Sequence, residues 1–342
     1  SARPEKSEVD AVLECGIRDI SIFTAYNEIN IQASMKTTKE RVLEKTVETI
    51  LYVKRHNAKA TLVLEDATRT PLEDILAIFG EGVKAGADRL VIADTVGFLR
   101  PLSMRYLISH VREGLTQLKT KDAPLGVLCK NDFGLATANT LAAVEEGASY
   151  VYTCIAGFGE RAGNAPLEEV ATALELLYDV DTGLDLTKIY RVSQLAEKTF
   201  ALPVQFHKPL IGDNAFLYAM DERSEGMLTQ PMLYEPFPPE IVGREAQYYL
   251  GRRAGKKLLE ARLTQAGIKA SSMQVDEIIR RMKRLHESVD KGEAQMTFYE
   301  IKKLIRDLRK GITEDEFWRA VEDVTRQKPK LKQPDAPGTT FP

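Results

Sequence analysis

Five short apolar runs, each rich in β-branched residues, recur at intervals over the first half of the 342-residue chain. The predicted strands cover residues 17–23, 60–65, 89–94, 124–130 and 150–157. Between them lie segments with apolar residues at three- and four-residue spacing, which predict helices over residues 38–55, 71–86, 102–118 and 136–147. Near-continuous apolar strands that alternate with helices indicate a parallel sheet covered on both faces. The fold class is therefore α/β, either an open sheet or part of a barrel.

Polar residues follow directly after four of these predicted strands. They are Glu65-Asp66, Asp94-Thr95, Lys130-Asn131-Asp132 and the segment that begins at Gly157. The carboxyl ends of parallel strands meet at one edge of the sheet, where α/β proteins build their sites. Lys130 is the most unusual of these residues, because an apolar run ends in it abruptly. The sequence predicts a functional site at this edge.

The segment 65–71, EDATRTP, places two acids, a hydroxyl group and an arginine at a strand end. Arg69 suits bidentate binding of a substrate carboxylate. The alternative is that Asp66 and Thr68 cap the next helix while Arg69 pairs locally. The residues alone leave both interpretations open.

The segment 157–164, GFGERAGN, is a glycine-containing loop between a strand and a helix. Glycine permits positive φ and a close approach of backbone to a ligand, and Glu160, Arg161 and Asn164 are expected to project over the strand ends. The spacing is not that of a dinucleotide or phosphate-binding loop. The alternative is an ordinary loop that contains a salt bridge.

The composition excludes several classes of protein. A net charge of −3 without a block of Lys or Arg argues against a nucleic-acid-binding protein. No apolar run is long enough to span a bilayer, so no membrane partner is expected. The three cysteines lie in apolar runs without metal-binding spacing, which is typical of reduced thiols in a cytoplasmic protein.

Four strand-end motifs in this order, EDATR, DTVG, CKNDFGLATAN and GFGERAGN, resemble one family. The chain is similar to the 2-isopropylmalate, homocitrate, citramalate and Re-citrate synthases, which belong to the HMG-CoA-lyase-like group. The similarity continues through SQLAEKTFALPV, KPLIGDNAF, YEPFPPEIVG and LGRRAGKKLLEARL, to about residue 305. The resemblance implies a (β/α)8 TIM barrel, of which this chain carries strands four to eight, followed by a small helical C-terminal subdomain. The first three strands are expected in a portion that precedes this sequence.

The chain divides, on this view, into four parts. Residues 1–203 are the TIM-barrel portion, 204–255 a linker or first subdomain, 256–326 a helical second subdomain, and 327–342 a disordered Pro-rich tail. Charged helical patterns cover residues 246–266, 274–289, 297–309 and 313–325.

The resemblance also implies a reaction and a set of site residues. The family condenses acetyl-CoA with a 2-oxo acid with the help of a divalent metal (Mg, Mn or Zn), and its members form dimers. The expected partners are therefore these two small molecules, with a homodimer or a hetero-oligomer with a related synthase. The resemblance implies substrate-binding roles for Arg69, Thr70 and Thr95 and a metal-ligand role for Asn164. Their place at the strand ends, and not the resemblance, gives the expected catalytic roles of Lys130 and Glu160 and the expected substrate-binding roles of Asn131, Asp132 and Arg161.

The sequence departs from the family at its metal-binding histidines. The two positions of the family's HxH pattern are Leu128 and Lys130 here, and the later HESG segment reads 218–221, YAMD. Leucine cannot bind a metal and a protonated lysine repels one.

Three functions stay open. The first is the family's acyltransferase reaction, with a metal held by oxygen ligands from Glu65, Asp132 and Asn164. The second is a metal-free enzyme in which Lys130 is a fixed charge or forms a Schiff base. The third is an inactive paralogue that serves as a partner subunit.

Overall fold

The computed structural model describes residues 1–118, 123–219, 225–228, 230–249, 256–287, 291–309, 311–312 and 314–327. The chain forms two compact units, Ser1–Tyr249 and Leu250–Pro342. Most of the predicted tail, residues 328–342, lies outside the described residues. The four-part division of the chain remains a prediction.

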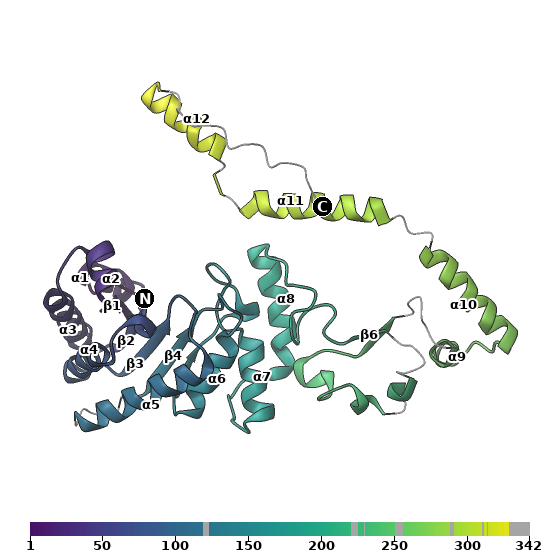
Figure 1. The fold of residues 1–342 in the computed structure, drawn as a ribbon, viewed down its shortest axis with the longest axis horizontal. Coiled ribbons are helices and arrows are strands. Elements are labelled where there is room, and N and C mark those ends of the chain that lie inside the picture. The colour runs from purple at the N-terminus through teal and green to yellow at the C-terminus, as the bar shows by residue number, and fades with distance from the viewer. Residues whose placement is uncertain are drawn as a thin grey trace. The chain divides into compact units, whose positions relative to one another are not determined.

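The first unit is built on a five-stranded parallel sheet whose strands follow one another in chain order (Figure 1). The strands are β1 (Asp19–Ala25), β2 (Lys59–Glu65), β3 (Arg89–Asp94), β4 (Leu125–Cys129) and β5 (Tyr150–Tyr152). The α-helices that precede β1 or join the strands are α1 (Lys6–Glu14), α2 (Glu28–Asn30), α3 (Lys39–Arg55), α4 (Leu72–Lys84), α5 (Pro101–Gln117) and α6 (Ala136–Glu145). This succession is that of consecutive βα units, and it confirms the predicted α/β class.

Short irregular helices occur between these elements and beyond them. They are η1 (Ile31–Met35), η2 (Ala67–Arg69), η3 (Ile155–Gly157), η4 (Leu186–Lys188), η5 (Glu225–Leu228), η6 (Pro231–Leu233) and η7 (Pro239–Val242). The last predicted strand, 150–157, is shorter than the sequence indicated. Cys154 leaves β5 because its backbone pairs with the 165–167 segment, where its N–H donates to the Ala165 carbonyl at 3.0 Å.

The ends of the helices follow from local chemistry. The Thr38 hydroxyl accepts a hydrogen bond from the Arg41 N–H at 3.3 Å and so caps α3. After α6 the chain turns through Gly147, whose φ of +91° is in the region that favours glycine. Both features agree with the helix boundaries predicted near residues 38 and 147.

The main core of the first unit lies between the sheet and its helices. Its largest fully buried side chains are Phe79, Ile20, Ile22, Ile50, Leu62, Leu64, Ile75, Ile78, Leu90, Ile92, Met104 and Ile108. Each such side chain contributes about 1.5–3 kcal/mol relative to an exposed one. Alternate strand residues point to the other face, where Val63, Val91 and Ala93 form a second buried cluster. This other face is called the inner face below.

The inner face is concave. β1 and β5 are the first and last strands of the sheet, yet the Ser21 hydroxyl on β1 lies 3.3 Å from the Tyr152 hydroxyl on β5. These hydroxyls meet because the sheet curls, as the strands of a barrel do. The polar residues after the strands therefore converge around one opening.

Two α-helices, α7 (Leu167–Leu177) and α8 (Ile189–Phe200), follow the sheet. Beyond them β6 (Leu217–Ala219) pairs in parallel with β7 (Gln247–Tyr249). The buried Arg244 guanidinium donates to the carbonyl groups of Ile211 (3.1 Å) and Gly212 (3.0 Å), which ties the chain before β7 to the loop before β6. The sequence predicted a helix from residue 246, and this was wrong for 247–249. The aromatic pair Tyr248-Tyr249 favours a strand, and β6 offers it a partner.

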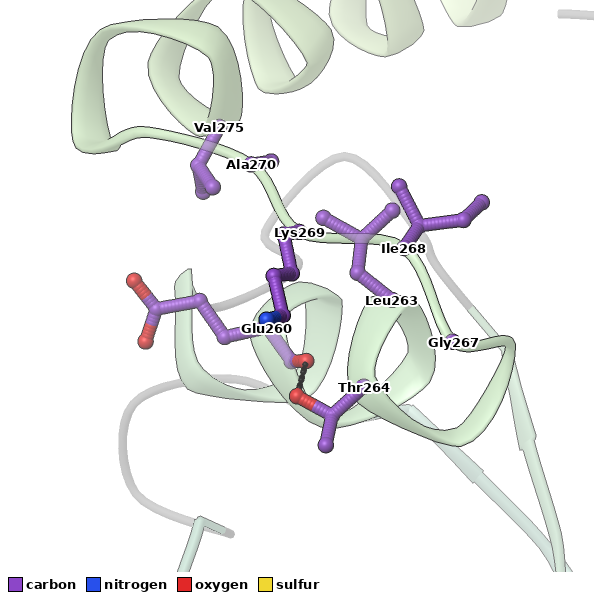
Figure 2. A pocket seen from close by; sticks show the side chains of 8 residues that line it. All are labelled: Glu260, Leu263, Thr264, Gly267, Ile268, Lys269, Ala270 and Val275. Carbon is purple, nitrogen blue, oxygen red and sulfur yellow. Dashed lines mark hydrogen bonds between the residues drawn. The ribbon is translucent and has the colours of Figure 1, made fainter.

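The second unit consists of four helices, α9 (Lys256–Gln265), α10 (Ser272–Glu287), α11 (Lys291–Arg309) and α12 (Glu314–Thr325), in its described part. A hollow of about 380 Å³ lies beside the turn between α9 and α10 (Figure 2). Its lining residues are Glu260, Leu263, Thr264, Gly267, Ile268, Lys269, Ala270 and Val275. Among the helices of the described residues, none is long and apolar enough to cross a membrane.

Candidate active site

The strand register decides which residues face the opening of the curled sheet. Phe23, Val63, Val91, Gly126 and Tyr150 lie side by side across the five strands. The residues two positions further along the strands lie on the same face but nearer its carboxyl edge. They include Glu65, Ala93, Leu128 and Tyr152. Thr95 and Lys130 lie two residues beyond Ala93 and Leu128, just past the ends of their strands. The candidate site is this carboxyl edge of the inner face.

Lys130 follows β4 at this edge and is nearly buried, with its side chain 13% exposed. Its backbone N–H donates to the Asp94 carbonyl at 3.2 Å, and its backbone also pairs with Asn164. The Lys130 Nζ lies 3.6 Å from Oε2 of Glu160, whose side chain is 82% exposed. The structure thus brings together the two residues for which the sequence predicted catalytic roles.

Asp132 and Arg161 form a bidentate pair at the same edge. Arg161 Nε and Nη2 donate to the two carboxylate oxygens of Asp132 at 2.8 and 2.9 Å, and Nη2 also donates to the Thr95 carbonyl at 2.6 Å. The guanidinium lowers the pKa of Asp132. Gly97 allows this arrangement, since a Cβ there would lie 2.7 Å from Asp132 Oδ2. The pair ties the loop of Arg161 to the ends of two strands.

Arg69 and Thr70 are held by Asp66. Arg69 Nε and Nη2 each donate to the Asp66 carboxylate at 2.7 Å, and the Thr70 hydroxyl donates to the Asp66 carbonyl at 2.9 Å. The local pairing of Arg69, left open by the sequence, is therefore present. Thr95 joins this group to the rest of the site, because its hydroxyl accepts from the Asp66 N–H at 2.8 Å.

Asn131 and Asn164 have mainly structural contacts. The Asn131 side-chain oxygen accepts from the Ala136 N–H at 3.1 Å, at the start of α6. The Asn164 Nδ2 donates to the Phe158 carbonyl at 3.0 Å and to Cys154 Sγ at 3.1 Å. Asn131 thus holds the start of a helix, whereas Asn164 holds the loop that carries Glu160 against the edge of Lys130.

Glu65, which the sequence predicted only as a possible metal ligand, is a further candidate. It is the last residue of β2 and half-buried, and no described residue forms a hydrogen bond or ion pair with its carboxylate. Burial raises the pKa of Glu65, and the nearby carboxylates of Asp66 and Glu160 raise it further. A half-buried carboxyl group with a raised pKa at a strand end suits proton transfer. Its two-residue spacing from the inward-facing Val63 was the sequence signal that could have identified it.

The residues at this edge do not fit a divalent metal ion. Of the two histidine positions that the family resemblance implies, Leu128 has no donor atom and packs in the inner-face cluster. Lys130 presents an ammonium group there. No group of three or more His, Cys, Asp or Glu side chains in the described ranges is arranged to hold a metal ion.

Comparisons with known proteins agree with this architecture. Residues 1–196 match the HMGL-like family model, and residues 210–290 match the model described as homocitrate synthase post-HMGL domain-like. The chain is 37% identical to the 2-isopropylmalate synthase of Methanocaldococcus jannaschii over 90% of its own length, but it spans only 58% of that relative. It is 36% identical to the homocitrate synthase AksA of Methanopyrus kandleri, over 83% of this chain and 70% of the relative.

Solved structures show the same fold. The HMG-CoA lyase of Bacillus subtilis superposes with a TM-score of 0.53 at 18% identity, over 59% of this chain and 70% of that one. The five-stranded sheet therefore corresponds to consecutive units of an HMGL-like barrel.

Proposed function

The chain belongs to the HMGL-like family, and on that premise we propose that it condenses acetyl-CoA with a 2-oxo acid. The family and its barrel fold are those that the sequence motifs predicted. The observation that carries the proposal is the order of the two matches in one chain, an HMGL-like barrel portion followed by a homocitrate-synthase post-barrel segment. Relatives similar over most of this chain are named isopropylmalate, citramalate and homocitrate synthases.

The proposed reaction forms one carbon–carbon bond and breaks one thioester. A proton leaves the methyl group of acetyl-CoA, the methyl carbon attacks the ketone carbon of the 2-oxo acid, and the ketone oxygen takes up a proton. Water then cleaves the thioester, which releases CoA as its thiol and leaves a carboxylate on the product. The site must therefore bind an anionic 2-oxo acid, accept a proton from a methyl group and stabilise negative charge on the ketone oxygen.

The residues at the carboxyl edge divide these tasks. Lys130 supplies a positive charge in a nearly buried position, suited to a carboxylate or an oxyanion. Glu65 accepts the proton, since its raised pKa lies closer to neutrality than that of an exposed glutamate. Thr95, Asn131 and the Asp132–Arg161 pair keep the surrounding loops in position. Arg69 contributes by holding the side chain of Asp66, and Thr70 by holding its backbone carbonyl.

Release of the CoA thiol tests this proposal. The purified protein is incubated with acetyl-CoA and, in turn, pyruvate, 2-oxoglutarate and 3-methyl-2-oxobutanoate, and the thiol is measured colorimetrically. We expect release that depends on one 2-oxo acid, and a loss of about a hundredfold or more in kcat for Glu65→Gln. Lys59→Met, at the opposite end of β2, is the control and should keep full activity. Thiol release that needs no 2-oxo acid would refute the proposal.

A second function is supported by one feature of Lys130. The Lys130 amine is nearly buried at the carboxyl edge of the inner face, and a desolvated amine can form a Schiff base with a ketone. A metal-free lyase or aldolase acting on a 2-oxo acid would use it in this way. Borohydride reduction in the presence of pyruvate, followed by mass spectrometry, separates the two: a reduced adduct on Lys130 favours the lyase, and an unmodified Lys130 favours the condensation.

The assembly and cellular location are part of the proposal. We propose a homodimer or a hetero-oligomer with a related synthase, in the cytoplasm, where the three free cysteines would stay reduced. Light scattering of the purified protein gives its mass in solution. A chain that binds no 2-oxo acid but co-purifies with an intact synthase would instead be an inactive partner subunit.

A further inference from the structure

Three cations stand at the carboxyl edge, and two of them are already neutralised. Arg69 donates two hydrogen bonds to Asp66, and Arg161 donates two to Asp132, all between 2.7 and 2.9 Å. A guanidinium that is held by a carboxylate in this way has little remaining attraction for a second anion. Binding an anionic ligand through either arginine would require an existing ion pair to open.

Lys130 differs from both arginines. Its ammonium forms no hydrogen bond to any residue that the structure describes, and its one ion-pair partner, Glu160, lies 3.6 Å away on a side chain that is 82% exposed. The lysine side chain itself is only 13% exposed. A nearly buried charge that lacks hydrogen bonds is unfavourable unless a ligand supplies them. The edge therefore offers one unsaturated cation to an incoming anion.

The neighbours of Lys130 also decide against a metal ion in the same place. Leu128 lies two residues before Lys130 on the same face of the sheet. It packs against the cluster of Val63 and Ala93 and offers no lone pair to a metal ion. A divalent cation beside Lys130 would be repelled by the ammonium without compensation from that side. Two of the three oxygen ligands considered from the sequence already have other partners: Asp132 is engaged by Arg161, and Asn164 holds the 158 carbonyl.

We propose that the Lys130 ammonium takes the place that a metal ion would hold, binding an oxygen of the 2-oxo acid directly, so that ligand binding needs no divalent cation. The choice of a 2-oxo acid as ligand rests on the proposed function; the use of an ammonium in place of a metal ion rests on the residues at this edge. Glu160 covers the ammonium when no ligand is present and moves aside when one binds, which its exposure allows.

Calorimetric titration of the protein with pyruvate and 2-oxoglutarate tests the inference. Each titration is run after treatment with a chelator, and again with added Mg²⁺ or Mn²⁺. We expect dissociation constants that agree within about twofold with and without metal. Lys130→Met, which keeps the length of the side chain and removes its charge, should weaken binding about tenfold or more, the usual effect of losing a hydrogen bond to a charged group.

Three variants serve as controls. Lys130→Arg keeps the charge and should bind more tightly than Lys130→Met, which separates loss of charge from loss of folding. Glu160→Gln removes the carboxylate that competes for the ammonium and should bind more tightly than the unaltered protein, which tests the proposed role of Glu160. Lys59→Met removes a positive charge from the opposite end of the sheet and should change nothing.

The outcomes separate this inference from the proposed function. Binding or turnover that disappears with the chelator and returns with Mg²⁺ or Mn²⁺ would overturn the inference while leaving the condensation intact. Metal-independent binding that Lys130→Met abolishes, without any release of CoA, would support the inference and count against the condensation. Unchanged affinity in Lys130→Met, or no 2-oxo acid binding at millimolar concentration, would overturn the inference.

Discussion

Two aspartates of the site each accept two hydrogen bonds from one arginine, but they differ in burial. Asp66 is 2% exposed, and its carboxylate also accepts hydrogen bonds from Asn27 (2.7 Å) and Asn30 (3.0 Å). Its partner Arg69 is 37% exposed and can turn to solvent, so the main cost of removing this carboxylate is the loss of a buried acceptor for the two asparagine amides, about 1–3 kcal/mol. The Asp132 side chain is 23% exposed, and a solvent-accessible pair contributes about 1 kcal/mol or less. We therefore predict that Asp66→Asn destabilises the protein by about 1–2 kcal/mol more than Asp132→Asn.

Asparagine is the right replacement at both positions. It preserves the shape of the side chain, and it tolerates the left-handed backbone of Asp66, whose φ is 53°. The change at Asp66 therefore tests the carboxylate rather than the backbone. Urea unfolding followed by circular dichroism gives the free energy of unfolding of each variant, provided that the slope of the transition is unchanged. Equal losses, or a larger loss for Asp132→Asn, would refute the assignment of Asp66 as the buried centre of this hydrogen-bond group.

Three further predictions concern the same region. The pKa of Asp132 is lowered in the folded protein. Its contribution to stability is therefore complete above the unfolded pKa of about 4 and is lost as the pH falls through the folded pKa. The free energy of unfolding of Asp132→Asn should consequently depend less on pH in the acid range than that of the unaltered protein. Gly97→Ala should lower the free energy of unfolding in urea by about 1–3 kcal/mol more than Gly134→Ala. Both glycines have positive φ (+65° and +72°), but only Gly97 lacks room for a Cβ. Similar losses would show that the residues around Gly97 shift to make room for the methyl group. Burial raises the pKa of the Cys129 thiol to about 12, so iodoacetamide at pH 8 should label the exposed Cys15 and spare Cys129 in the native protein, and equal labelling would contradict the burial of β4.

Much of the sheet could be predicted from the sequence because its strands are buried on both faces. Apolar β-branched runs such as 60–65 and 89–94 leave little choice of structure, and their observed bounds differ from the prediction by one residue at most. The end of β5 was harder, because Cys154 looks like a strand residue but pairs with a segment that follows the loop. The strand at 247–249 was missed since its partner, β6, lies about thirty residues earlier in the chain.

The positions of the candidate residues were predicted better than their pairing. Strand ends place Lys130, Asp132 and Thr95 together whatever their partners are. Which carboxylate an arginine chooses depends on side-chain geometry that no spacing reveals, and Arg69 pairs with the aspartate three residues before it. The raised pKa of Glu65 could not be predicted, because it comes first from burial, which only the curled sheet produces.

The most direct test of the account is to observe the new carbon–carbon bond. Acetyl-CoA with a heavy carbon isotope in its methyl group and a 2-oxo acid with the same isotope in its ketone group are incubated with the chelator-treated protein, and the product is examined by carbon NMR. We predict a one-bond coupling between the two labelled carbons, formed without added metal and lost in Lys130→Met. Labelled acetate and unchanged 2-oxo acid as the only products, or a coupling that appears only when Mg²⁺ or Mn²⁺ is supplied, would contradict it.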